Sequence, residues 1–492
     1  MFTQETADAQ AKPEGRPGIS IKHKEKDMKI LVLNGSPTGE NSITLQTVNY
    51  IGEFFPDCTF DVLHVGARIR LYENDFSEAK AALEAADLIL FCYPVYTFLV
   101  PAQLHRFIEL MKESGAEIAG KFAAQITTSL HFYDVTAHRF IEGNCADMGL
   151  RSLGVLSADM EDLLHEKGQK EALDFWRFVM WSADQEAAAG HAGSPAADPE
   201  PDAWVGKLVI VTDLAPEPDE SLRAADEAAY EKALLDHAAD MPLRGMIRAF
   251  RAEAPFKTKV VNLREFPFKG GCLGCFHCAS DGTCIYQDGF DEFLRKKIQR
   301  ADAIVYAYRV KDHSMGYRMK LFDDRQFCNG HRTVTMGRPV GYLVDGDLSA
   351  EPNLQMLMEA RAQVGGNFLA GIASTGGAEA LPAGQIERLA RTLAYAVKYE
   401  YQPPKNFYGV GGLKIFRDLI WQMQGLMKED HRFYKAHGFY DFPQKRAGRM
   451  LAMYLVGGMM GSKTLQKKIG GKMTEGMLLP YRKVLEKARR KG

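Results

Sequence analysis

Four cysteines lie close together in the second half of this 492-residue chain: Cys272, Cys275, Cys278 and Cys284. Their spacing, C-x2-C-x2-C-x5-C, allows the thiols to converge on one inorganic group, and four cysteine thiolates are the usual ligands of an iron–sulfur cluster. Zinc sites more often use two separated pairs of cysteine or histidine. The run therefore predicts a redox centre. A zinc site and a group of redox-active thiols without a cluster are the alternatives that the spacing leaves open.

A second motif follows the first apolar stretch of the chain, residues 28–33. Residues 34–44, NGSPTGENSIT, combine glycines with hydroxyl and amide side chains and open a helical pattern. Glycine lets the backbone approach a ligand closely, and a helix N-terminus offers unpaired N–H groups and partial positive charge. The segment is neither G-x-G-x-x-G nor a Walker A motif, so it predicts a phosphate monoester site. An ordinary strand–helix turn capped by Ser42 is the alternative.

Both features belong to a pattern that the chain repeats. Lys207–Val211 resembles Met28–Leu33, and Ala301–Ile304 repeats the sequence of Ala86–Ile89 as Ala-Asp-x-Ile. The second copy is longer between these two stretches, and the cysteine run lies in the extra length. Self-similarity over so long a period predicts a duplicated domain.

The loops of the two copies differ in charge. Residues 212–221, which correspond to the phosphate loop, contain four carboxylates and no glycine. A phosphate charge ~6 Å from one carboxylate is repelled by roughly 3 kcal/mol at an effective dielectric of ~20. Residues 93–104 form an apolar loop with aromatic flanks that suits a flat ring, whereas the second copy has Arg309-Val310-Lys311 in place of Pro94-Val95-Tyr96. We expect only the first copy to bind a phosphorylated ring.

Short apolar stretches alternate with helical patterns in both copies, which predicts an α/β fold of parallel sheets with helices on both faces. A net charge of −2 provides no field for nucleic acid. The cysteine usage fits a reducing compartment, and no signal peptide or transmembrane segment is apparent, so a cytoplasmic protein is expected. The predicted regions are a disordered leader (1–27), a first domain (28–185), a linker (186–204), a second domain (205–400) and a helical extension (401–492).

The extension ends in a basic segment. Its last 32 residues hold ten Lys or Arg against two Glu. A solvated helical face is the simplest interpretation, and contact with an acidic partner or a membrane surface is the alternative.

The motifs together resemble the NADPH-dependent FMN reductase family of flavodoxin-like proteins. The resemblance rests on Asn34–Pro37 with Asn41-Ser42, on Pro94–Tyr96 and on Pro101–Leu104. The cysteine run, with Gly282, resembles the iron–sulfur flavoprotein branch of that family. The resemblance implies two tandem flavodoxin-like doubly wound parallel sheets over about residues 28–400, followed by the helical C-terminal extension.

The family resemblance also implies roles for particular residues. The loop after the first strand holds the FMN phosphate in that family, the next loop lies along the flavin ring, and a third closes the site. The cysteine run holds one [4Fe-4S] cluster. Carried over to this sequence, the expected FMN contacts are Ser36, Asn41, Ser42, Thr44, Pro94, Val95, Tyr96, Thr97, Phe98, Thr128 and Ser129, and the expected cluster ligands are Cys272, Cys275, Cys278 and Cys284.

The first copy keeps the flavin loops and lacks the cysteines, and the second does the reverse. We therefore expect a fused pseudo-dimer: a flavin-dependent oxidoreductase that relays electrons between a cluster and FMN across the interface of its halves. The cofactors would carry the chemistry, with no side chain as acid or base. The enzyme is expected to be NAD(P)H-dependent or ferredoxin-linked, with a small molecule or protein as electron donor or acceptor and a homo-oligomer compatible with the pattern. The alternatives are an NAD(P)H-dependent FMN or quinone reductase without a cluster, and a non-catalytic interaction scaffold.

Overall fold

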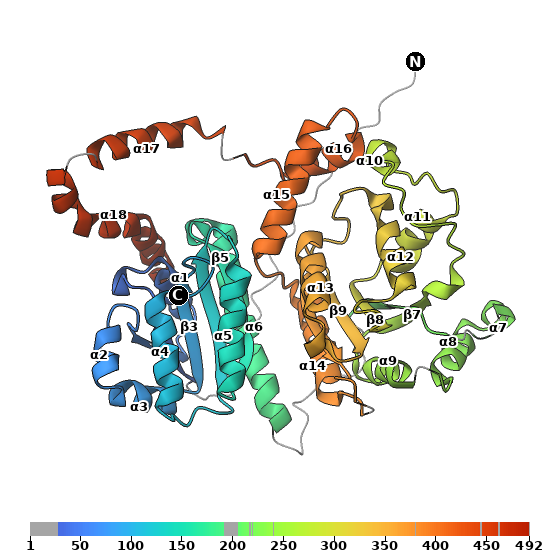
Figure 1. Ribbon diagram of the computed structural model, residues 1–492, viewed down its shortest axis with the longest axis horizontal. Helices are drawn as coiled ribbons and strands as arrows, with labels where there is room; N and C mark the ends of the chain where they lie inside the picture. Colours follow the sequence, from blue (N-terminus) through green and yellow to red (C-terminus); the bar gives the residue numbers. More distant parts are fainter. Residues whose placement is uncertain are drawn as a thin grey trace.

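The computed structural model describes residues 28–190, 205–215, 218, 220–239, 241–378, 380–442, 445–460 and 463–491. The predicted leader and most of the predicted linker lie outside these residues. The chain forms two halves that lie side by side, each built on a five-stranded parallel sheet, and a helical C-terminal part (Figure 1). The predicted α/β fold class is therefore confirmed.

The front half has the strand order β2-β1-β3-β4-β5, which is the flavodoxin-like order. Strands β1 and β3 are apolar and buried because helices cover both faces of the sheet. Its strands are β1 (Met28–Asn34), β2 (Cys58–Leu63), β3 (Leu88–Pro94), β4 (Phe122–Ser129) and β5 (Arg151–Asp159). Its helices are α1 (Ile43–Gly52), α2 (Ile69–Asn74), α3 (Ser77–Ala85), α4 (Ala102–Glu113), α5 (Asp134–Asp147) and α6 (Glu166–Gly190).

The back half repeats this order as β7-β6-β8-β9-β10. Its strands are β6 (Lys207–Thr212), β7 (Lys257–Asn262), β8 (Ala303–Arg309), β9 (Pro339–Asp345) and β10 (Phe368–Ser374). Its helices are α7 (Glu220–Ala225), α8 (Glu227–Asp236), α9 (Met241–Glu253), α10 (His277–Asp281), α11 (Phe290–Phe293), α12 (Tyr317–Arg325), α13 (Pro352–Gly365) and α14 (Ala383–Tyr399). The cysteine run lies between β7 and β8, in the length that the front half lacks.

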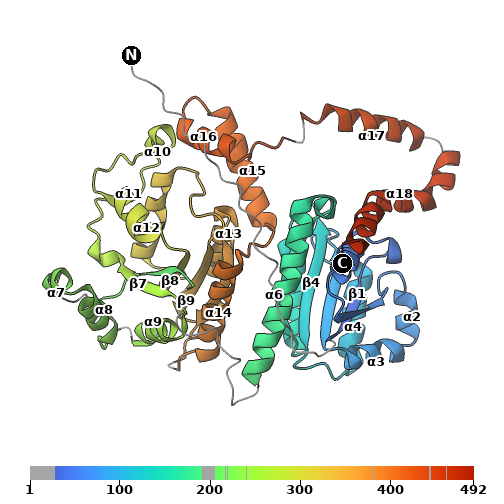
Figure 2. The same ribbon diagram turned by 180° about the vertical axis from the view of Figure 1, so that it is seen from behind.

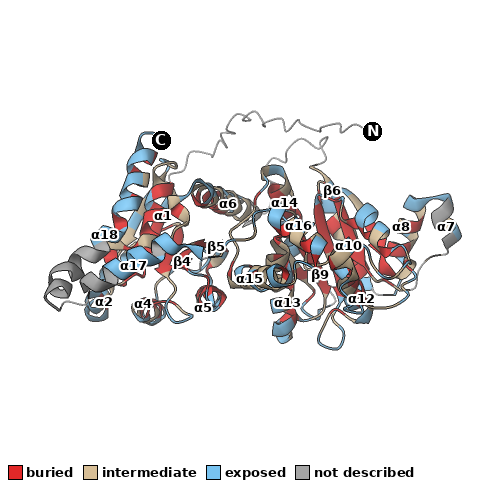
Figure 3. Ribbon diagram, turned by 90° about the horizontal axis from the view of Figure 1, so that it is seen from above, coloured by how far each residue is buried: buried red, intermediate tan, exposed pale blue. Residues whose placement is uncertain are grey.

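Each half has its own core, and Figure 3 shows the buried residues gathered around the two sheets. The halves meet along α6 and α14, which face each other in Figure 2. Phe178 stacks on Tyr401 with 4.7 Å between ring centroids, and Trp181 lies 4.5 Å from Tyr395. Because α6 runs to Gly190, the predicted linker begins inside this helix.

The C-terminal part touches both halves. Helices α15 (Phe407–Gln422) and α16 (Lys428–Ala436) pack beside the back half, and α18 (Lys463–Arg489) returns to the front half. Tyr481 and Leu485 of α18 are buried in a cluster with Tyr50 of α1. Helix α17 (Ala447–Met460) stands away from both halves in Figure 1. Among the described residues, no helix is both long and apolar enough to cross a bilayer.

Candidate cofactor site

A cavity of about 500 Å³ opens at the carboxyl ends of β1, β3 and β4. Ligands bind at this edge of open parallel sheets, where the strand order reverses between β1 and β3. Every residue that the sequence predicted to contact FMN lines this one cavity. Its walls are Ser36, Thr38, Asn41, Ser42, Ile43, Thr44, Pro94, Val95, Tyr96, Thr97, Phe98, Thr128, Ser129, Leu130, Phe132, Met160 and Met477.

The loop after β1 is held in shape by Asn34, which the sequence analysis did not select as a site residue. Its side-chain amide donates to the carbonyl oxygen of Gly39 at 2.8 Å, and its Oδ1 accepts from the backbone N–H of Ser36 at 3.2 Å. Gly39 has φ +59°, a conformation that glycine adopts without strain. The loop is therefore shaped before any ligand arrives.

Hydroxyl groups from the loop after β1, from α1 and from β4 line the cavity. Thr44 Oγ1 lies 2.6 Å from Thr128 Oγ1, and Ser36 Oγ lies 2.8 Å from Thr38 Oγ1. Ser42 caps α1, because its hydroxyl oxygen accepts from the backbone N–H of Leu45 at 3.3 Å. Ser42 is therefore the N-cap of α1, as the alternative from the sequence proposed. The cap also places the first turn of α1, with its unpaired backbone amides, at the cavity.

The second wall contains a strained turn. Tyr96 and Leu99 exchange two backbone hydrogen bonds of 2.8 and 3.0 Å, and the residues between them, Thr97 and Phe98, have φ +48° and +70°. Such turns normally take Asn or Gly, and a bulky residue there costs on the order of 1–3 kcal/mol. Thr97 and Phe98 both line the cavity, so this strained turn forms part of its wall.

The back half keeps this turn and changes its chemistry. Lys311 and Ser314 exchange backbone hydrogen bonds of 2.8 and 3.0 Å, around Asp312 at φ +49° and His313 at φ +61°. Arg309 Nε donates to Asp345 at 2.7 Å. The apolar ring wall of the front half is therefore replaced by charged groups, as the sequence predicted. The acidic loop 212–221 lies partly outside the described residues.

The C-terminal part contributes to the cavity, which no motif in the sequence indicated. Met477 of α18 lines one side. At the aromatic rim, Phe98 and Phe132 lie 5.2 Å apart, and Tyr133 stacks on Phe407, the first residue of α15, at 4.3 Å. The extension thus supplies one lining residue of the cavity and packs against its aromatic rim.

Beneath this rim lies a buried polar network. His131 Nδ1 lies 3.0 Å from Asp134 Oδ2, and Ser157 Oγ donates to the same oxygen at 2.6 Å. Asp134 Oδ1 also accepts from the backbone N–H of Phe407 at 2.9 Å, which ties the start of α15 to the front half. Burial opposes ionisation, but the bonds from His131 and Ser157 hold the pKa of Asp134 below its usual value. His131 is thus held in place by the polar side chains beneath the rim.

We expect the buried His138, next to this network, to make the stability of the fold depend on pH. Burial lowers its pKa to about 4 against the attraction of Asp134, and its Nε2 lies 3.1 Å from Thr127 Oγ1. Between pH ~6.5 and ~4 the unfolded chain therefore binds a proton here that the folded chain does not. By linkage, the free energy of unfolding falls as pH drops through this window, by up to about 3 kcal/mol.

Replacing His138 by glutamine is expected to flatten this part of the stability curve. Urea unfolding at pH 7, 6, 5 and 4 measures the change, and substitution of the exposed His165 by glutamine is the control. An equal pH slope in wild type and His138→Gln would show that His138 titrates normally in the folded protein.

The four predicted cluster ligands line a second cavity, of about 340 Å³, in the back half. Cys272 and Cys275 are exposed, and Cys278 and Cys284 are half-buried. The same cavity contains a fifth cysteine, the buried Cys328, which follows α12 and had no motif to reveal it. Burial raises the pKa of Cys278, whose thiol donates to the Phe327 carbonyl at 2.8 Å.

Arg325 braces this cavity from behind. It forms a buried ion pair with Asp288 at 2.8 Å and donates to the carbonyl oxygen of Gly270 at 2.9 Å, two residues before Cys272. Its Nε is buried and makes no hydrogen bond within the described residues, but against the effect of burial Asp288 and the Cys284 thiol both raise the pKa of Arg325, so the guanidinium already interacts with one of the four cysteines. A cation beside several thiols fits an anionic group in this cavity.

Within the described residues, no three His, Cys, Asp or Glu side chains lie close enough together to hold one metal ion. Four cysteine thiolates are a donor set that a four-iron cluster and a zinc ion both use.

Helix α15 lies between the two cavities. Its first residue, Phe407, packs on the rim of the front cavity, and Ile420 belongs to the same buried apolar cluster as Ala279, the residue after Cys278. At a rise of 1.5 Å per residue, these two contacts are about 20 Å apart. The cavities are therefore held at opposite ends of one helix.

Comparison with protein-family models finds a match that lies in the front half. Residues 28–138 match the model of a family described as NADPH-dependent FMN reductase. An iron–sulfur flavoprotein from Archaeoglobus fulgidus is 27% identical over 176 residues, which is 34% of this chain and 79% of that protein.

Two solved structures are also similar. An NADPH-quinone reductase from P. pentosaceus is 15% identical and has a TM-score of 0.25, covering 32% of this chain and 98% of its own. An FMN-dependent NADH-azoreductase from Bacillus anthracis, solved with FMN, is 12% identical with a TM-score of 0.24, again over 32% and 98%. These two likenesses are too weak to support any statement about activity.

Proposed function

We propose that this chain is an FMN-dependent oxidoreductase that binds FMN non-covalently in the front cavity. The observation that supports this most is that all the predicted contacts line one cavity, with neutral donors at one end and aromatic side chains at the other. None of the described residues lining it is acidic. The match of residues 28–138 to the FMN reductase family supports the same proposal.

Each wall has a distinct task in this proposal. The first turn of α1 and the hydroxyls of Ser36, Ser42 and Thr44 hold the phosphate. The turn Tyr96–Leu99, with Thr128 and Ser129, orients the ring. Met160 and Met477 exclude water. FMN, when bound, accepts a hydride or single electrons. NAD(P)H is the proposed donor, and a small molecule or a protein takes up the electrons.

We also propose that Cys272, Cys275, Cys278 and Cys284 hold one [4Fe-4S] cluster, which carries single electrons. The similarity to an iron–sulfur flavoprotein, the shared cavity and the Arg325 guanidinium beside the thiols support this assignment. Because Cys272 and Cys275 are exposed and free, we also propose that the protein works in the reducing cytoplasm, where such thiols do not form disulfides. The relay of electrons between this cluster and FMN across the interface of the halves, which the sequence suggested, is kept as part of the proposal.

The two halves are proposed to be copies of one ancestral domain. Their sheets share one strand order, and both contain the turn with two positive-φ residues at the same place after the third strand. Strained non-glycine turns are rare, so their recurrence supports duplication more strongly than the common strand order does.

Cofactor content of the full-length chain, purified and reconstituted without oxygen, tests the proposal. We expect about one FMN and about four irons per chain. Cys275→Ser should lose iron and keep FMN, whereas Cys58→Ser, outside the cysteine cavity, should keep both. Two FMN per chain would contradict the division of labour between the halves. FMN reduced by NADPH without iron would identify a cluster-free reductase, and a colourless protein would favour a scaffold.

A further inference from the structure

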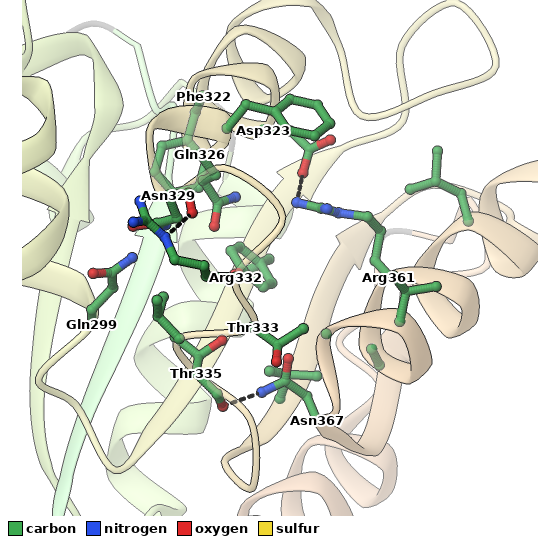
Figure 4. Close-up of a pocket in the computed structure, with 18 of the residues that line it drawn as sticks. Gln299, Phe322, Asp323, Gln326, Asn329, Arg332, Thr333, Thr335, Arg361 and Asn367 are labelled. Atoms are coloured by element: carbon green, nitrogen blue, oxygen red, sulfur yellow. Dashed lines mark hydrogen bonds and ion pairs between the residues drawn. The ribbon is translucent and has the colours of Figure 1, made fainter. Parts of the chain in front are cut away.

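A third cavity, of about 190 Å³, lies in the back half on the face of the sheet, between β8 and β9 on one side and α12 and α13 on the other (Figure 4). Residues 326–335 pass over it. It is distinct from the cysteine cavity but shares Phe327, Gly330 and His331 with it as a common wall. No residue of the proposed FMN site lines it.

The cavity exists because a helix is short. In the front half, Phe107, Leu110 and Met111 of α4 are buried against the sheet. Phe322 of α12 takes the place of Phe107, but α12 ends at Arg325. Arg325 stands where Leu110 would be and turns to Asp288, while the polar Gln326 stands in the place of Met111 and lines the cavity. The sheet face is therefore left uncovered at this point.

The equivalent position in the front half carries a tyrosine whose hydroxyl has a hydrogen-bond partner. Tyr93 of β3 donates a hydrogen bond of 2.7 Å to Gln125 of β4. Pairing in the two sheets has the same register: Phe91 lies opposite Gln125, and Tyr306 lies opposite Tyr342. Tyr308 thus takes the position of Tyr93, and an aromatic ring replaces the accepting amide.

The Tyr308 hydroxyl is consequently unsatisfied. The residue lines the cavity, is 1% exposed, and its hydroxyl has no hydrogen-bond partner among the described residues. A buried hydroxyl without a partner costs about 1–3 kcal/mol. Burial also raises the pKa of Tyr308, so the group stays protonated and remains a donor. The cavity therefore offers a hydrogen bond that the protein itself does not use.

The remaining walls define the shape of what fits. Met315, Met319 and Phe322 are apolar, and the rings of Tyr306 and Tyr342 lie 5.5 Å apart. Methionine and aromatic side chains favour contact with another ring. Two polar pairs also line it: Asn367 donates to the Thr335 carbonyl at 2.6 Å, and Arg361 pairs with Asp323, as Figure 4 shows.

We propose that this cavity binds a single-ring aromatic compound whose carbonyl oxygen accepts a hydrogen bond from Tyr308. The volume supports one ring, because an apolar cavity of about 150 Å³ is enough for benzene. Three fused flavin rings are too large for it. Since Phe327 and His331 separate the cavity from the cysteines by one layer of side chains, the ligand would lie next to the proposed redox centre.

Two probes of equal shape test the proposal on the full-length purified chain. Acetophenone has the ring and the carbonyl, and α-methylstyrene carries a CH2 group in place of the oxygen. Ligand-observed NMR titration should show acetophenone binding about 2- to 10-fold more tightly, the worth of one hydrogen bond. Tyr308→Phe should weaken acetophenone by the same factor and leave α-methylstyrene unchanged.

A second variant locates the binding. Ala362 of α13 is buried and lines the cavity, so Ala362→Phe should fill it and abolish binding of both probes. A crystal soaked with acetophenone gives the same information if that variant does not fold. Equal affinity for the two probes, no effect of Tyr308→Phe, or density for water alone at the Tyr308 hydroxyl would each overturn the proposal. None of these outcomes depends on FMN or iron content.

Discussion

Replacing Gly66 by alanine is expected to abolish FMN binding. Gly66 follows β2 and lies against the phosphate loop, and its N–H donates to the Asn34 carbonyl at 3.0 Å. An added Cβ would stand 2.3 Å from the carbonyl oxygen of Gly35 and 2.5 Å from the carbonyl carbon of Ser36. These are backbone atoms, so no side chain can rotate away. The loop must move, and we expect at least a ~100-fold loss of affinity, equivalent to about 3 kcal/mol.

Fluorescence titration of the apoprotein with FMN measures this effect. Gly52→Ala is the matched control, because its Cβ would meet Phe60 at an ordinary 3.7 Å. Gly52→Ala should bind FMN as the wild type does, and thermal unfolding of both variants shows whether the fold is kept. Unchanged affinity in a folded Gly66→Ala protein would mean that the loop after β1 does not hold the phosphate.

Substitution of Arg325 by methionine is expected to lower the free energy of unfolding of the back half by about 3–5 kcal/mol. The Arg325 and Asp288 side chains are 0% and 2% exposed, so the variant leaves a buried carboxylate without its partner. Guanidinium unfolding measures the loss. Arg295→Met is the control, because its ion pair with Asp291 is solvent-exposed and worth less than about 1 kcal/mol.

A double variant separates stability from iron binding. Arg325→Met combined with Asp288→Leu removes both charges and should recover most of the stability. Iron content should stay low in both variants, since Arg325 holds the Gly270 carbonyl and lies beside the cysteines. Full iron in the double variant would show that Arg325 acts only through its pair with Asp288, and a cost below 1 kcal/mol would contradict the buried pair itself.

Local patterns were enough to predict the front cavity. Apolar stretches such as Leu88–Phe91 determine which segments become buried strands. In a parallel sheet the loops after neighbouring strands meet at one edge, so Ser36, Tyr96 and Thr128 had to converge once the strand order was known. The same reasoning located the cysteine run, because spacing within one loop is a local property.

Four features depended on contacts that sequence spacing does not encode. Met477 reaches the front cavity only because α18 folds back onto α1, and Phe407 caps the rim only because α15 starts beside Asp134. Cys328 joins the other cysteines through the path of the chain after α12. In the sequence Tyr308 looks like an ordinary core tyrosine. Only the structure shows that its hydroxyl lacks, among the described residues, the hydrogen-bond partner that the equivalent tyrosine of the front half has.

The sequence by itself thus determined the strands, their alternation with helices, and the chemical character of each loop, since these follow from residue type and short-range periodicity. Only the tertiary structure decided how far apart the two cofactor cavities stand, what the C-terminal helices cover, and which buried hydroxyl lacks a partner. Those properties arise from packing between residues distant in the chain, and that packing depends on the shape of whole elements.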